Sequence, residues 1–334
     1  NDLGEAFSHL AKQYGGIVRF HGLLNKPYLL ITDPKLVQMI LSRPYDFPKF
    51  RINTAIFKEL IGEGITLAEG NSHKRQRKMM SPSFSFANVK EMIPTFVQAG
   101  HNLKAIWMKE IGNKREERIT ITAIISKITL DVIGLHRLNP LYMDLSNLLP
   151  FIRKFPTRDN NKYYDSIKTI NNISEKLLAD QKNCPVQGTD LLSLLVKSND
   201  QLPVAEQLTH YELVSQVKTF ILAGHETTSV ALSWTLYFLA ANPDIQYRLR
   251  KEILAILPDR DCHPTFDQIE QLKFLECVFK EVLRIIPPEF KSILAVIIRN
   301  LEFKLVEGFT FEKKYGGTIK PNPGIDLLVS SVDC

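Results

Sequence analysis

Apolar residues recur at helical spacing along much of the chain, and the longest such stretch runs from Thr209 to Ala241. Thr209 and Glu212 have the spacing of a capping box, in which each side chain bonds the other residue's backbone N–H, and Asn242-Pro243 supplies a stop. The pattern predicts one helix of about 45–50 Å, at 1.5 Å per residue. Because apolar side chains cover nearly every face of its second half, we expect that half to be buried in a core.

The middle of this helix breaks the apolar pattern. Residues 223–228, AGHETT, place a glycine, a carboxylate and two hydroxyls in an otherwise apolar helix, and we call these six residues the notch. Glycine costs about 1 kcal/mol against alanine in a helix, and a buried carboxylate costs more unless it is paired. Either a ligand lies against the notch, or the helix kinks there and its Thr hydroxyls bond back to carbonyls. A zinc-peptidase helix is excluded, because Ser229 stands four residues after His225, where a second histidine is required.

The flanking sequence predicts more helices and a short hairpin. Residues 1–14 have a helical pattern that ends at Gly15-Gly16, and two β-rich runs, Ile17–Phe20 and Tyr28–Thr32, are separated by turn residues. Asp33-Pro34 begins the next helix. Amphipathic or apolar-periodic patterns predict the remaining helices over 119–134, within 141–202, over 244–257 and over 272–286. We therefore predict a mainly α fold with small β-sheets (α+β) in a single domain over residues 1–334.

The composition is that of an ordinary globular protein. The 334 residues are 44% hydrophobic and 23% charged, and 42 Lys+Arg against 36 Asp+Glu give a net charge of +6. This diffuse basic excess suits an acidic partner or an anionic membrane surface and does not favour binding to nucleic acid. The sequence has no uncharged apolar run of 18 residues. Because it opens on Asn1 without an initiator Met, we treat the N-terminus as a cut end.

The cysteines do not form a recognisable site. Cys184, Cys262, Cys277 and Cys334 are scattered without a C-x-x-C pair, which indicates reduced thiols in a protein that faces the cytosol. Cys262-His263 is a lone pair in a turn, and a metal site needs more ligands.

Two other motifs place charged residues at helical spacing. In residues 70–84, GNSHKRQRKMMSPSF, His73 and Arg77 stand at i and i+4 within a basic run. In residues 280–288, KEVLRIIPP, Glu281 and Arg284 stand at i and i+3. Taken alone, the first is a solvated helix face, and the second is a surface salt bridge worth roughly a few tenths of a kcal/mol.

Together, the three motifs resemble those of the cytochrome P450 family, in the family's order. AGHETT resembles its oxygen-binding helix, the His73–Arg77 pair its W/H-x-x-x-R motif, and KEVLRIIPP its K-helix. The phrase ITLDVIG at 128–134 resembles its fifth helix, and GHETT, His73 and the ending IIRNLEF are similar to fungal members of the microsomal type. The resemblance covers most of the chain and implies the cytochrome P450 fold with a haem b (iron) cofactor.

The resemblance also implies a role for each motif residue. Gly224 would leave space for dioxygen, the Thr227 hydroxyl would donate a hydrogen bond at the oxygen site, and Glu226 would relay protons. Ala223 and Thr228 would contact the haem. Arg77 and His73 would bind a haem propionate. Glu281 and Arg284 would form a buried network behind the haem.

A monooxygenase of this family inserts one atom of dioxygen into an apolar organic substrate. Its electrons come from NADPH through a cytochrome P450 reductase, which the other basic residues of 70–84 are candidates to dock. The resemblance further implies that the protein is located at the cytosolic face of the endoplasmic reticulum membrane, held there by an N-terminal anchor that this sequence has lost. The helices within 141–202 would line the substrate channel.

One family motif is not in the sequence. The loop F-x-x-G-x-R-x-C-x-G, whose cysteine is the axial ligand of the haem iron, would stand between Pro288 and Glu289, and residues 289–303 resemble the helix that follows it. None of the four cysteines has that context, so we assign no metal ligand and expect a fold that is incomplete on the proximal side. The sequence also departs from the family near Leu135–Pro140. The alternative function is a non-catalytic P450-like remnant without haem, which at most binds a hydrophobic ligand or partner.

Overall fold

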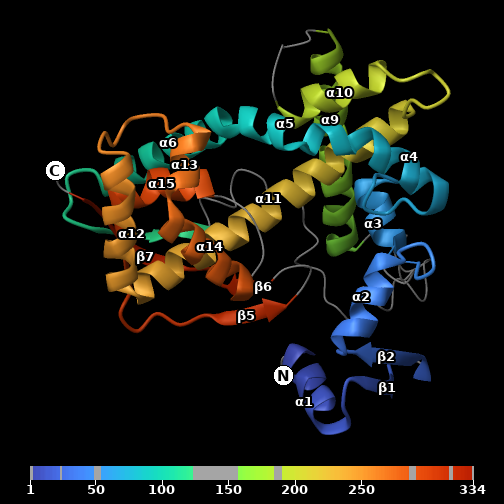
Figure 1. Cartoon of the computed structure of the whole chain (residues 1–334), viewed down its shortest axis with the longest axis horizontal. Helices are drawn as coiled ribbons and strands as arrows, with labels where there is room; N and C mark the ends of the chain where they lie inside the picture. The colour runs from blue at the N-terminus through green and yellow to red at the C-terminus, as the bar shows by residue number, and fades with distance from the viewer. Residues whose placement is uncertain are drawn as a thin grey trace.

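The computed structural model describes residues 3–22, 25–48, 54–122, 157–183, 190–285, 291–315 and 319–332. These residues form mainly helices, with small antiparallel sheets at the edges, as the sequence predicts (Figure 1). The expected break between Pro288 and Glu289 lies outside the described residues, as do residues 123–156.

The N-terminal elements follow the predicted order. Helix α1 (Leu3–Tyr14) leads into a hairpin of β1 (Ile17–His21) and β2 (Pro27–Ile31), which pair antiparallel. Helix α2 (Pro34–Ser42) begins at Asp33, whose Oδ1 accepts hydrogen bonds from the N–H groups of Lys35 and Leu36, both at 3.0 Å. This contact is the N-cap that the Asp-Pro sequence predicts.

The next elements include the helix that contains the basic motif. They are α3 (Thr54–Ile61), α4 (Gly70–Met80), the 3₁₀ turn η2 (Ser81–Phe84), α5 (Phe86–Glu91), α6 (Ile93–Ile111) and β3 (Glu117–Thr120). The prediction of a helix from residue 119 is wrong at its start. Ile119 and Thr120 pair with Leu327 and Asp326 in a sheet, because a strand far along the chain offers them hydrogen-bond partners.

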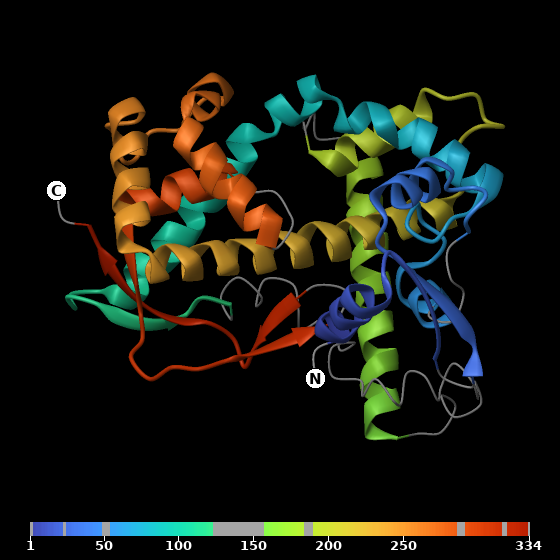
Figure 2. The same cartoon turned by 60° about the horizontal axis from the view of Figure 1, so that its bottom comes forward.

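The longest helix, α11 (His210–Ala241), crosses the whole molecule (Figure 2). Both hydrogen bonds of the predicted capping box are present, because the Thr209 side chain accepts from the Glu212 N–H and the Glu212 side chain accepts from the Thr209 N–H. Helices α9 (Arg158–Asn183) and α10 (Leu191–Asp200) lie beside its N-terminal half.

The C-terminal elements surround the second half of α11. They are α12 (Pro243–Ile256), α13 (Phe266–Gln271), α14 (Lys273–Ile285), α15 (Lys291–Asn300), β4 (Leu301–Leu305), β5 (Glu312–Tyr315), β6 (Ile319–Asn322) and β7 (Asp326–Ser331). The sheet order is β3-β7-β4, and β5 pairs with β6.

The largest core cluster forms where α6, α11 and α15 meet this three-stranded sheet. Leu232, Trp234 and Leu236 of α11 are buried there, which confirms the prediction for the second half of that helix. Helix α15 packs closely along α6 at Gly100, where an added Cβ would lie 3.1 Å from the Cβ of Val296. In the described part of the chain, no helix has the length and apolar character needed to cross a bilayer.

Candidate functional site

The notch lies in an uninterrupted stretch of α11, between its two buried halves. Ala223 and Gly224 are exposed, and Thr227 and Thr228 are half-buried. An ideal Cβ on Gly224 would meet no heavy atom of the described residues within 4 Å. The prediction for Glu226 concerns a side chain that lies outside the described part. With respect to the described residues, the notch is thus open at Ala223 and Gly224, in the middle of the longest helix.

The Thr227 hydroxyl is bonded within its own helix. It donates to the Ala223 carbonyl at 2.6 Å, in the same i to i−4 pattern that Ser233 and Thr235 make with Ser229 and Ala231, both at 2.8 Å. This is the back-bonding that the sequence offered as the alternative to a ligand site. To donate a hydrogen bond to a ligand, the Thr227 hydroxyl must leave this carbonyl, which costs about one hydrogen bond, or roughly 1 kcal/mol net.

On α4, the two predicted residues His73 and Arg77 differ in their surroundings. His73 Nδ1 lies 3.1 Å from the Tyr45 hydroxyl, and the two rings meet edge to face. The Arg77 side chain is exposed, and its guanidinium has no hydrogen bond or ion pair in the described structure. Arg77 is therefore an available cation with a planar pair of donors, as the binding of a carboxylate requires.

Two residues between them attach α4 to the start of α11. Arg75 forms an ion pair with Glu212, the capping-box residue, and Arg75 Nη1 donates to the Gln207 carbonyl at 2.8 Å. Gln76, fully buried, accepts a hydrogen bond from Gln216 Nε2 at 2.5 Å. Arg75, one of the candidates for docking a reductase, is thus already paired within the protein. Its partner lies 137 residues away in sequence, so the local basic pattern carried no signal of it.

The Glu281–Arg284 pair forms on α14, and it is exposed instead of buried. Arg284 Nε and Nη2 donate to the two carboxylate oxygens of Glu281, each at 2.8 Å, while 60% of the Glu281 side chain and 70% of the Arg284 side chain remain accessible. The hydrogen bond from Arg284 lowers the pKa of Glu281, and Glu281 raises the pKa of Arg284. Both residues of this ion pair belong to one helix, so the pair forms without a contact from any other element.

Neither described cysteine resembles an axial ligand. Cys262 Sγ accepts a hydrogen bond from Arg299 Nη1 at 3.0 Å in the loop after α12, and Cys277 is exposed on α14. Cys184 and Cys334 lie outside the described residues. Among the described residues, the notch and the exposed Arg77 have the chemistry suited to a haem face and a propionate, and neither Cys262 nor Cys277 is placed as an iron ligand. No reaction step can be derived through the iron with these residues alone.

The sequence comparisons assign the chain to a class of haem proteins. A profile of the family described as "Cytochrome P450" matches residues 1–139 and 135–304. The chain therefore belongs to the cytochrome P450 family. The two matched segments overlap at residues 135–139, within the stretch where the sequence departs from the family's usual continuation.

Curated relatives have the same family name and are mostly fungal. Cytochrome P450 monooxygenase 128 of Postia placenta is 29% identical over 330 residues, which cover 84% of this chain and 60% of that protein. Cytochrome P450 monooxygenase claP of Ampulloclitocybe clavipes is 28% identical, with 86% and 60% covered, and Cytochrome P450 72A68 of Medicago truncatula is 28% identical, with 84% and 59% covered. The chain spans about 60% of the length of the relatives it matches.

Proposed function

We propose that this protein, in a form that carries the cysteine loop, is a haem-thiolate monooxygenase acting on an apolar organic substrate. The observation that carries the proposal is the open notch at residues 223–228 in the longest helix of a cytochrome P450 chain. When bound, the haem would supply dioxygen activation with electrons from an NADPH-dependent reductase.

The described residues would then act around the group. Ala223 and Gly224 would leave space against its face, and the Thr227 hydroxyl would give up the Ala223 carbonyl to donate a hydrogen bond. The exposed guanidinium of Arg77 would neutralise a propionate, because a planar fork binds a carboxylate through two donors. His73, held by Tyr45, would support the same edge.

We propose the second function, a non-catalytic remnant, for the 334-residue chain as it stands. Two observations favour it. Neither Cys262 nor Cys277 has the surroundings of an axial ligand, and the Glu281–Arg284 pair is exposed. In this form the chain would retain the distal wall and lack the thiolate on which the family's chemistry depends.

Location and redox partner are proposals of the same kind. We propose the cytosolic face of the endoplasmic reticulum for the monooxygenase form, by analogy with the microsomal members of the family. For the reductase surface, Lys74 and Lys78 remain candidates: Lys74 lies over the Tyr45 ring at 4.6 Å, and Lys78 is exposed in a loose pair with Glu206 at 3.4 Å.

A carbon-monoxide difference spectrum of the reduced protein tests both proposals. The chain would be expressed with added haem as it stands, with an F-x-x-G-x-R-x-C-x-G loop inserted after Pro288, and with the same loop carrying serine for its cysteine. We expect the thiolate-type Soret band from the cysteine insertion alone. A thiolate band from the uninserted chain would refute the remnant proposal. Haem uptake by none of the three proteins would refute the proposed haem site.

A further inference from the structure

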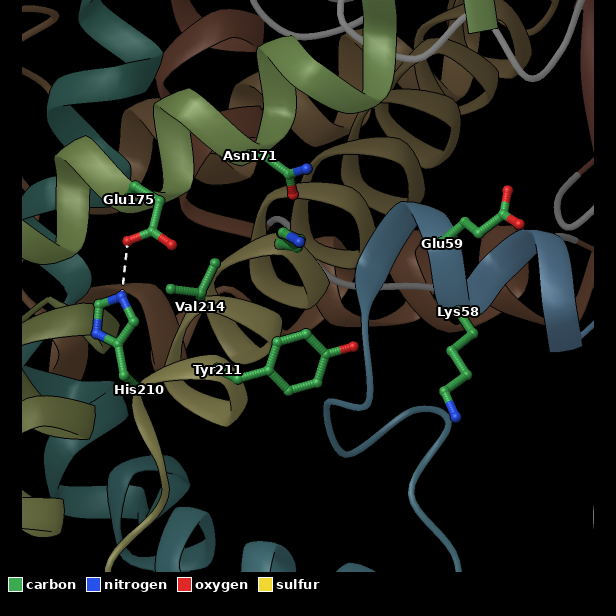
Figure 3. A pocket seen from close by; sticks show the side chains of 8 residues that line it. Lys58, Glu59, Asn171, Glu175, His210, Tyr211 and Val214 are labelled. Atoms are coloured by element: carbon green, nitrogen blue, oxygen red, sulfur yellow. Dashed lines mark hydrogen bonds and ion pairs between the residues drawn. The ribbon is translucent and has the colours of Figure 1, made fainter. Parts of the chain in front are cut away.

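Arg299, near the end of α15, is a fully buried cation that has no carboxylate partner among the described residues. Other charged side chains of the protein do have one. In the pocket drawn in Figure 3, for example, His210 Nε2 lies 2.8 Å from Glu175 Oε2. Because a buried charge is costly unless it is paired, the groups around the Arg299 guanidinium have to account for its position.

The Arg299 guanidinium contacts the loop between α12 and α13. Nη1 donates to the Asp259 carbonyl and to Cys262 Sγ, both at 3.0 Å, and Nη2 donates to the Cys262 carbonyl at 2.7 Å. Nε is buried and has no hydrogen-bond partner among the described residues. In a planar guanidinium the Nε–H and one N–H of Nη2 point the same way, so the unused donor lies on the side of the group that faces Cys262.

Cys262 is half-buried, and basic side chains gather around it. His101 of α6 has its Nε2 3.3 Å from the Cys262 carbonyl, and its ring stacks on that of His263 with the centroids 4.7 Å apart. Burial lowers the pKa of His101, and nearby positive charges act in the same direction. Asp261, the residue before the cysteine, forms an ion pair with Lys104 of α6 at 2.6 Å, so this carboxylate is already bonded.

A purely structural role does not account for all of these contacts. Two of the three hydrogen bonds of Arg299 go to backbone carbonyls, which any residue in the loop would supply. The contact with sulfur and the unused Nε–H require another reason. A cation that touches sulfur favours negative charge on it, and partly exposed cysteines in positive surroundings are the reactive ones. An oxygen atom bonded to this sulfur would be a stronger acceptor than the thiol and would find a donor still free.

We propose that Cys262 is a redox site, at which hydrogen peroxide converts the thiol to a sulfenic acid that the Arg299 guanidinium holds. The thiol gives its proton to solvent, and Sγ attacks one peroxide oxygen, so that an S–O bond forms as the O–O bond breaks. The leaving hydroxide takes up a proton and becomes water. Sulfur loses two electrons, and the peroxide gains them. The product has an oxygen that accepts hydrogen bonds from the buried cation.

Treatment of the 334-residue chain with hydrogen peroxide and dimedone, which alkylates sulfenic acids, tests the proposal when the labelled peptides are quantified by mass spectrometry. Cys277 is the internal comparison, because it is exposed on α14 and no described arginine donates to its sulfur. Exposure alone would favour Cys277, whereas we expect Cys262 to be labelled about tenfold faster. Equal or faster labelling of Cys277, or no label on Cys262, would overturn the proposal. This comparison uses the parent chain, so it decides even where a variant does not fold.

Two substitutions assign the effect to one side chain. Arg299→Lys keeps the charge but loses the planar fork, and it should slow the labelling of Cys262 by about threefold or more. Arg250→Lys is the matched control: its Nε and Nη2 donate to the carbonyls of Ile298 and Leu301, both at 2.8 Å, without touching the cysteine. Its effect should stay within about twofold. Circular dichroism would verify the fold of each variant. A folded Arg299→Lys protein with the parent's labelling rate, or an equal loss in both variants, would contradict the inference.

Discussion

Replacing Gly224 with alanine tests whether the notch is open. An ideal Cβ at this position meets no heavy atom of the described residues within 4 Å, so we expect the added methyl group to cause no packing strain. Alanine is more favourable than glycine in a helix interior by about 0.5–1 kcal/mol, because glycine loses more backbone freedom on folding. We expect Gly224→Ala to raise the free energy of unfolding by this amount and the melting temperature by about 2 °C.

Gly100 provides the matched control, because it also lies inside a helix but at a closed position. A Cβ there would lie 3.1 Å from Val296 Cβ and 3.4 Å from Ile293 Cα, both on the neighbouring helix α15. Val296 is fully buried, so it has little room to move away. Overpacking of this kind costs about 1–3 kcal/mol, which exceeds the gain in helix propensity. Gly100→Ala should therefore lower stability while Gly224→Ala raises it.

Urea unfolding followed by circular dichroism measures both variants beside the parent chain. A shift of the midpoint at constant slope reports a change in stability alone. If Gly224→Ala destabilised the chain, another part of the protein would have to fill the notch, and the argument for an open ligand surface would fail. A stability gain accompanied by loss of haem binding in the loop-inserted protein would instead show that the glycine is kept for the ligand.

Further substitutions test the contacts around α11. Arg75→Met should lower the free energy of unfolding by about 1–3 kcal/mol, because Glu212, whose side chain is only 12% accessible, loses its cation. Arg77→Met should change the free energy of unfolding by less than about 0.5 kcal/mol, since Arg77 is exposed. Chemical unfolding measures both variants. Because the folded-state pKa of Lys218 is lowered, the folded chain binds fewer protons than the unfolded chain between that pKa and 10.5, and this lysine makes stability rise with pH across that window. Lys218→Met should be more stable than the parent at neutral pH and should lose this component of the rise, and an unchanged pH profile would contradict the lowered pKa of Lys218. In the loop-inserted enzyme, Thr227→Ala should divert electrons from product to peroxide, and unchanged coupling of NADPH use to product would exclude its role.

Local signals allowed much of the fold to be predicted. The capping box at Thr209 and the N-cap at Asp33 depend on residues two or three positions apart, so the sequence contains all of the information, and both are present. The strand at Ile119 depends on Leu327, more than two hundred residues later, and the helical pattern around it gave the wrong element. The sequence predicts an element well where its partners are neighbours, and poorly where they are distant.

The candidate site shows the same difference between local signals, which the sequence contains, and distant contacts, which it does not reveal. The motif residues were found because their spacing is characteristic of a family. Spacing did not separate Arg75, which pairs with Glu212, from Arg77, whose guanidinium has no partner among the described residues. Lys218 gave no signal at all, because one lysine in a long helix usually lies at the surface. Only the packing of α3 and α9 against α11 shows that this lysine is buried.

Helix α14 shows why a family motif can persist in a fold without its usual surroundings. Its apolar face, with Leu275, Phe279 and Val282 buried, holds the helix against the core. The Glu281–Arg284 ion pair joins two residues of one helical turn on the solvent-accessible side of the helix. An exposed ion pair of this kind contributes little to stability. The forces that place α14 are therefore separate from the residues that define the motif. A chain can keep this helix, and its place against α11 and α15, whether or not the haem side of the protein is complete.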